Sequence, residues 1–134
     1  MSNKIVSKSI AAVIVISIFV LALSSCIFED NKIAGIKNSY FEDYSTEATI
    51  GEALEGFCED TEWEIFTEGN KEYVKFSGEG MLWGYGNRAS LIIVVFEIER
   101  DWFWVNSMSV NGKELNDVEI SNTLYEIFTR YDEK

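Results

Sequence analysis

Residues 89–98 read Ala-Ser-Leu-Ile-Ile-Val-Val-Phe-Glu-Ile, and residues 102–110 read Trp-Phe-Trp-Val-Asn-Ser-Met-Ser-Val. The first run is apolar on both faces of an extended chain, which is typical of a central strand. The second run is rich in aromatic and apolar side chains, and only the polar residues 99–101 separate the two. We therefore expect two strands here, joined by a short connection.

Two more strands are predicted before this pair. Residues 63–67 and 73–77 are rich in aromatic and β-branched side chains, and Glu68-Gly69-Asn70-Lys71 between them is typical of a hairpin turn. Glycines 78, 80, 84 and 86 indicate a loop or an irregular edge before residue 89. The pair Asn111-Gly112 is a strong turn signal after the last strand, because both residues tolerate a positive φ.

Two amphipathic helices flank the strands. The first begins at a capping box formed by Thr49 and Glu52, and the second begins at Asn116, with Glu119 three residues further on. Their apolar stripes are Ile50, Ala53, Leu54, Phe57 and Cys58 in the first helix, and Ile120, Leu124, Ile127, Phe128 and Tyr131 in the second. A helix, four antiparallel strands and a helix bury one another most simply as a two-layer α+β sandwich, which we predict for residues 40–134.

The first residues of the chain are typical of a secretory signal peptide. Lys4 and Lys8 precede the apolar stretch 10–23, and small residues then lead to a cysteine. The tetrapeptide Leu23-Ser24-Ser25-Cys26 resembles the lipobox of bacterial lipoproteins. We therefore interpret residues 1–25 as a lipoprotein signal peptide.

The lipobox resemblance implies cleavage between Ser25 and Cys26 and a diacylglyceryl thioether on the Cys26 sulfur. Residues 26–39 would then be a lipidated tether, unless their apolar side chains dock on the domain. The expected location is the extracytoplasmic face of a cell membrane, inner or outer. The alternative is an uncleaved transmembrane anchor, because residues 9–28 are 20 positions without a charge.

Charge and composition limit the classes of partner. All 23 acidic residues but only 9 of the 11 basic ones follow Cys26, so the predicted mature chain has a formal net charge of −14. Such a domain repels nucleic acid, and we exclude nucleic-acid binding on that ground. Lipidation of Cys26 would leave Cys58 as an unpaired thiol, and its place on an apolar helix face predicts a core position.

The chain offers little for catalysis or metal binding. It contains no histidine, which removes the commonest general base and every zinc site with a histidine ligand. We therefore predict no cofactor, no metal and no enzyme activity. The alternative is a carboxylate-dependent hydrolase acting on envelope material. Its candidate carboxylates are Glu59, Asp60, Glu62 and Glu64, and Glu97, Glu99 and Asp101, which we expect at element ends and on polar strand faces.

Aromatic side chains are the remaining candidates for a binding site. Because side chains alternate along a strand, at least one of Trp102, Phe103 and Trp104 must face away from its neighbours. We hypothesise that Trp83, Tyr85, Trp102 or Trp104 belongs to a surface that binds an envelope protein or a glycan. The alternative is that both faces of the sheet are covered, one by the helices and one by the tether or residues 40–44.

Residues of about 38–131 also resemble a small domain of uncharacterised bacterial envelope proteins. The resemblance is carried by Tyr40 and Tyr44, Thr-Ile-Gly-Glu-Ala at 49–53, Glu55-Gly56-Phe57, Trp63-Glu64, Val-Lys-Phe-Ser-Gly at 74–78, Asn111-Gly112 and the last helix. These are capping, core and turn features, so the resemblance implies a shared fold and no particular activity. We expect a non-catalytic binding or structural module of a lipoprotein.

Overall fold

The structure is a computed structural model of the chain, and it describes residues 31–132. Residues 33–134 form one compact unit, and the account below is of that unit. The predicted signal peptide and the Cys26 lipidation site lie outside the described residues. The described elements are helical residues 31–37, then α2 (Ile50–Phe57), β1 (Glu59–Glu68), β2 (Lys71–Gly80), the 3-10 turn η2 (Trp83–Tyr85), β3 (Ser90–Glu99), β4 (Trp102–Val110), β5 (Lys113–Glu114) and α3 (Asp117–Asp132).

The strands form a five-stranded antiparallel sheet in the order β1-β2-β3-β4-β5. The α+β class is confirmed, whereas the prediction of four strands is wrong because β5 was missed. β5 has only two residues and pairs with β4 through Val110 and Lys113. Asn111 and Gly112 have φ of 52° and 85°, so the predicted turn folds the chain directly back on β4.

β2 extends three residues beyond its prediction, because Gly78 and Gly80 lie inside the strand and not in a loop. Both glycines are close to the end of α2. A Cβ at Gly78 would lie 2.7 Å from the Cβ of Cys58, and one at Gly80 would lie 2.6 Å from the ring of Phe57. Here glycine therefore permits close packing of a strand against a helix end.

A β-bulge in β4 explains how this strand contributes apolar side chains along its whole length. Val95 and Phe96 are adjacent on β3, but their partners on β4 are Ser107 and Val105, which leaves Asn106 as the extra residue. Without the extra residue, Val105 and Met108 would point to opposite faces. With it, both lie on the core side of the sheet.

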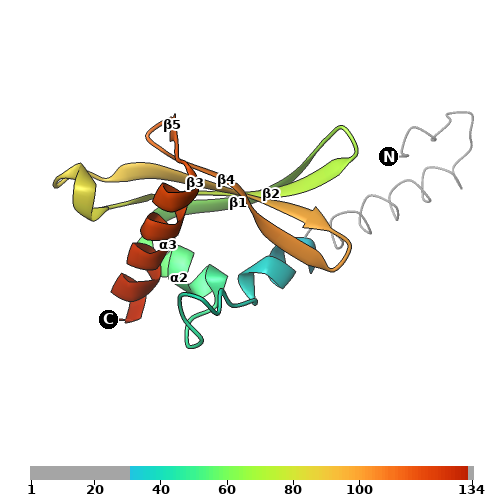
Figure 1. Cartoon of the computed structure of the whole chain (residues 1–134), viewed down its shortest axis with the longest axis horizontal. Helices are drawn as coiled ribbons and strands as arrows, with labels where there is room; N and C mark the ends of the chain where they lie inside the picture. Colours follow the sequence, from blue (N-terminus) through green and yellow to red (C-terminus); the bar gives the residue numbers. More distant parts are fainter. Residues whose placement is uncertain (1–30, 133–134) are drawn as a thin grey trace, which may run out of the picture. The chain divides into compact units, whose positions relative to one another are not determined.

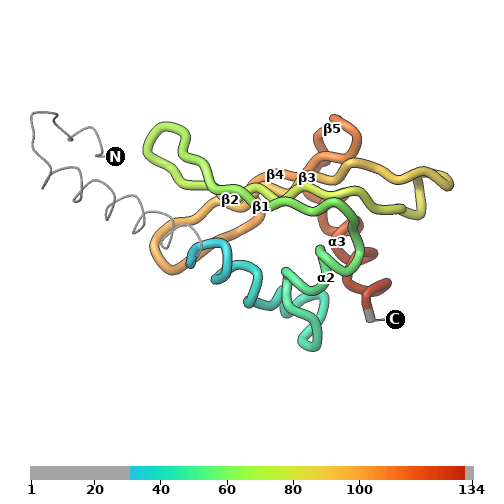
Figure 2. The backbone as a smooth tube through the Cα atoms, turned by 180° about the vertical axis from the view of Figure 1, so that it is seen from behind, coloured from blue at the N-terminus to red at the C-terminus, as the bar shows by residue number. Residues whose placement is uncertain are grey.

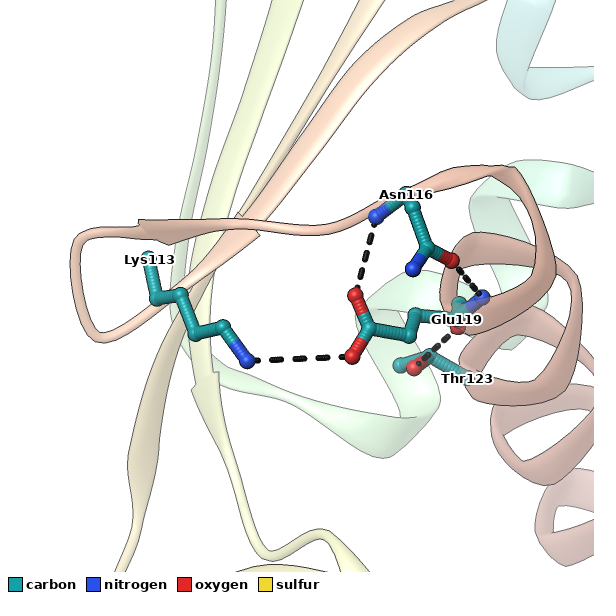
Figure 3. Close-up of polar contacts among 4 residues, drawn as sticks. All are labelled: Lys113, Asn116, Glu119 and Thr123. Atoms are coloured by element: carbon teal, nitrogen blue, oxygen red, sulfur yellow. Dashed lines mark hydrogen bonds and ion pairs between the residues drawn. The ribbon is translucent and has the colours of Figure 1, made fainter.

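The predicted capping box of α2 and the predicted N-cap of α3 are both confirmed. The Glu52 N–H donates to the Thr49 hydroxyl at 3.1 Å, and the Thr49 N–H donates to the Glu52 carboxylate at 2.9 Å. At the start of α3, Asn116 and Glu119 exchange the same pair of bonds at 2.9 Å each, as Figure 3 shows. Lys113, just after the β4–β5 turn, lies 3.7 Å from the Glu119 carboxylate and links β5 to the helix.

The helices lie on one side of the sheet, below it in the view of Figure 1. Their apolar stripes meet the inward side chains of β2, β3 and β4, and the largest fully buried side chains include Phe76, Phe96 and Phe128. Ile36 is also buried, with 2% of its surface exposed. The stretch 26–39 is therefore not a tether throughout, since residues 33–37 are helical and dock on the core.

Candidate binding surfaces

The sheet face opposite the helices has its own row of aromatic and charged residues. In the register of the sheet, Phe66 on β1 pairs with Tyr73 on β2, Tyr73 pairs with Glu97 on β3, and Glu97 pairs with Trp104 on β4. The neighbouring row, which contains Phe96, points into the core. We call the surface that contains the first row the open face.

An aliphatic stripe crosses the open face along β3. Leu91, Ile93 and Val95 alternate with Ile92, Val94 and Phe96, which are completely buried against the helices. Leu91 is 43% exposed, and Ile93 and Val95 are partly exposed. These three side chains make the centre of the open face apolar.

Glu97 is the buried polar residue of this face. Its side chain is 10% exposed and lies 3.4 Å from the ammonium group of Lys71. In the same row, Phe66 and Tyr73 stack with ring centroids 5.0 Å apart. The ion pair and the stacked rings therefore hold Glu97, Phe66 and Tyr73 in place by contacts within the face.

The predicted alternation of the aromatic run is confirmed. Phe103 points toward the core and contacts Phe96 edge to face at 6.0 Å. Trp102 and Trp104 point to the open face, and they are 75% and 41% exposed. Two of the four proposed binding residues therefore lie on one surface.

Residues 40–44, one of the two segments that could have covered the open face, pack on the core side of the sheet instead. The ring of Phe41 stacks on Phe96 at 6.3 Å, and the ring of Tyr44 stacks on Phe128 at 5.8 Å. The Tyr44 hydroxyl also lies 3.2 Å from the Ser121 hydroxyl on α3. Residues 40–44 thus leave the open face uncovered, and in Figures 1 and 2 no helix between residues 31 and 132 lies on that side of the sheet.

Trp83 and Tyr85, the other two proposed residues, lie at the opposite end of the sheet. They form η2, which precedes β3, whereas Trp102 follows β3, and ten strand residues span about 30 Å. Figure 1 shows this separation, with η2 in the yellow loop and the β3–β4 turn in orange. The four aromatic residues therefore form two surfaces and not one.

α3 holds η2 in place through two side chains. The Glu126 carboxylate accepts a hydrogen bond from the Trp83 backbone N–H at 2.7 Å and pairs with Arg130 at 2.9 Å. The Arg130 guanidinium donates to the Met81 carbonyl and lies 5.4 Å from the centroid of the Trp83 indole. These contacts fix the backbone of η2, and the Trp83 side chain remains 62% exposed.

A pocket of about 470 Å³ opens beside η2, and it is lined by Phe57, Glu59, Asp60, Glu79, Gly80, Met81, Ala89 and Arg130. Its three acidic lining residues come from the bulged start of β1 and the end of β2, where Glu59 and Glu79 are direct cross-strand partners. All three are exposed. The two buried carboxylates of the described chain, Glu97 and Glu126, do not line this pocket, and each is paired with a cation.

Cys58 is a core residue, as the sequence predicts, although it is the C-cap of α2 in an extended conformation and not part of the helix. It is 5% exposed, and burial raises the pKa of its thiol to about 12. The neutral thiol therefore dominates at physiological pH, and Cys58 fills space between α2 and β2.

Sequence reasoning missed the aliphatic stripe and the Phe66–Tyr73 pair as parts of a surface. A weak signal was present, because the period-2 pattern of β1 places Glu62, Glu64, Phe66 and Glu68 on one face. The long apolar run of β3 indicated burial on both sides, and only the position of the helices distinguishes its two faces.

Comparison with known protein families, with curated proteins and with solved structures found no match. Within residues 31–132, no helix has the length and apolar character needed to cross a membrane. The same residues contain no group of three or more acidic or cysteine side chains placed to hold a metal ion.

Proposed function

We propose that this chain is a lipid-anchored protein of the bacterial cell envelope whose domain is a non-catalytic binding module. In this proposal, residues 1–25 are the signal peptide, and Cys26 carries the lipid on the extracytoplasmic face of the membrane. The domain is a two-layer α+β sandwich when free, and its open face receives a partner. The lipobox-like residues 23–26 support the anchor, and the open face supports the binding role.

The exposed aromatic residues of the open face are the single observation on which the binding role depends. Trp102 and Trp104 expose 75% and 41% of their surfaces on the face that also carries the stacked pair of Phe66 and Tyr73, with Glu97 between Trp104 and Tyr73. Water-exposed aromatic surface on a rigid sheet is unfavourable for a free protein and is typical of contact sites. Leu91, Ile93 and Val95, which precede Glu97 on β3, add apolar area to the same face.

The arrangement of carboxylates favours binding over the alternative of a carboxylate-dependent hydrolase. A general acid of that class needs a buried carboxyl group inside the pocket where the substrate sits. Here the acidic residues that line the pocket, Glu59, Asp60 and Glu79, are exposed. The two buried carboxylates among the described residues, Glu97 and Glu126, do not line the pocket, and each forms an ion pair, with Lys71 and Arg130 respectively. We therefore retain the binding module as the proposed function.

The anchor is tested by expressing the full chain beside its Cys26→Ser variant in a bacterial host. We expect a mature species that begins at Cys26, carries a diacylglyceryl adduct by intact mass and fractionates with membranes. The variant should lack the adduct and keep its N-terminal residues. A wild-type species of full-length, unmodified mass in the membrane fraction would replace the lipid anchor with a transmembrane segment.

The open face is tested by acrylamide quenching of tryptophan fluorescence in the full-length protein. A Trp83→Phe background removes the exposed indole at the other end of the sheet. We expect strong quenching from Trp102 and Trp104, and its loss when both are replaced by phenylalanine, because Trp63 is packed against Phe76 at 4.9 Å. Weak quenching before that replacement would mean that the face is covered, which contradicts the binding role.

A further inference from the structure

The charges around the open face are strongly unbalanced. The described residues place Glu62, Glu64 and Glu68 of β1, and Glu79 of β2, on this side of the sheet. The two lysines of the face are already paired, Lys71 with Glu97 and Lys75 with Glu64, both at 3.4 Å. Among residues 31–132, the carboxylates of Glu62, Glu68 and Glu79 form no ion pair within 4 Å, and four carboxylates against two lysines leave the β1–β2 side of the face acidic.

The apolar part of the face is long and narrow. It runs along β3 from Leu91 through Ile93 and Val95 to the row that holds Glu97 and Trp104, over the seven strand residues 91–97 and about 20 Å. An α-helix covers that length with about 13 residues. The opposite face of the same strand is already covered by amphipathic helices, which is the usual way in which one face of a sheet is buried.

From these two features we propose that the open face docks an amphipathic helix of a partner protein. The apolar stripe of that helix lies along Leu91, Ile93 and Val95, and its flank over β1 is rich in lysine and arginine. The charge of this chain, formally −12, makes a second copy a poor occupant, because two acidic edges would meet. The inference depends on the proposed binding role of the open face.

The probe is a fluorescent amphipathic peptide of about 18 residues made of leucine and lysine, compared with a leucine–glutamate peptide of the same pattern. The full-length protein is held in phosphatidylcholine nanodiscs, and empty nanodiscs give the background. We expect binding of the basic peptide, at least about tenfold tighter than that of the acidic one, and a several-fold weakening when NaCl rises from about 50 to about 200 mM.

Matched substitutions separate docking on the face from attraction to the net charge. Val95→Lys places a charge on the stripe, and Val118→Lys makes the same change on α3, where Val118 is 69% exposed. We expect Val95→Lys to weaken peptide binding about tenfold and Val118→Lys to change it less than about twofold. Leu91→Lys is the second stripe variant in case Val95→Lys disturbs the fold, which circular dichroism checks.

Three results would overturn the inference. Equal weakening by Val118→Lys and the stripe variants would mean non-specific attraction, and no binding of the basic peptide would mean that such a helix does not dock. A dimer in sedimentation that Val95→Lys dissociates would identify a second copy as the occupant. If acrylamide reaches Trp102 and Trp104 but the peptide does not bind, this inference fails alone. If acrylamide does not reach them, the proposed function fails as well.

Discussion

The ammonium group of Lys71 lies 3.4 Å from the carboxylate of Glu97, and the same distance separates Lys75 from Glu64 on the same face of the sheet. The two ion pairs differ in environment. The Glu97 side chain is 10% exposed, whereas that of Glu64 is 56% exposed. Loss of the lysine therefore leaves a desolvated charge in one case and a hydrated charge in the other.

This difference predicts unequal effects of two identical substitutions. Lys71→Met should destabilise the domain by about 1–3 kcal/mol, because it leaves the Glu97 carboxylate without a cation in a mostly buried place. Lys75→Met should cost less than about 1 kcal/mol, as is usual for exposed pairs. Urea denaturation followed by circular dichroism measures both. Equal losses of stability would show that burial of Glu97 does not strengthen its pairing with Lys71.

Gly80 and Gly84 differ in the space available for a methyl group. A Cβ at Gly80 would lie 2.6 Å from the Phe57 ring, whereas nothing lies within 4 Å of a Cβ at Gly84. Gly80→Ala should destabilise the domain by about 1–3 kcal/mol, because α2 must move away from β2. Gly84→Ala should change the free energy of unfolding by less than about 0.5 kcal/mol. Thermal unfolding of both variants checks the pair, and a tolerated Gly80→Ala would mean that Phe57 moves freely.

The N-cap of α3 offers a comparison within one helix. Asn116→Ala should cost about 1 kcal/mol, because the Glu119 N–H loses the acceptor that it has at 2.9 Å. Asn122→Ala, at an exposed interior position of the same helix, should be neutral or stabilise by a few tenths of a kcal/mol, since alanine has the higher helix propensity. Chemical denaturation gives both values, and a destabilising Asn122→Ala would argue against this assignment of roles.

Burial of the Cys58 thiol predicts a loss of stability at high pH. Its pKa is about 12 in the folded protein against 9.0 when unperturbed, so between these values the unfolded chain releases the proton and the folded one keeps it. The thiol therefore leaves the free energy of unfolding unchanged below pH 9, and between pH 9 and the folded-state pKa it lowers that free energy by about 1.4 kcal/mol per pH unit.

The measurement is the difference in free energy of unfolding between the wild type and Cys58→Ala at pH 8 and at pH 10.5. Tyrosine and lysine titration affects both proteins equally, so it cancels in the difference. We expect the free energy of unfolding of the wild type, relative to that of Cys58→Ala, to be smaller at pH 10.5 than at pH 8. The native thiol should also react slowly with a disulfide reagent at pH 8, and rapid labelling of Cys58 without unfolding would contradict its burial.

Local sequence determined the parts of this protein that depend on few neighbours. The capping boxes at Thr49 and Asn116 and the turn at Asn111-Gly112 were predictable, because each is formed by residues at most three positions apart. The bounds of β4 also followed from its composition. β5 was missed because a two-residue strand has no periodicity of its own, and it exists through its pairing with β4.

The tertiary structure alone decided which face of the sheet is open. In sequence, Ile93 and Val95 do not differ from Ile92 and Val94, and the helices pack against only one of these pairs. Likewise, nothing local shows that Phe41 and Tyr44 join the core side. Periodicity specifies that a strand has two faces, whereas the packing of distant segments determines which of them is covered and which can meet a partner.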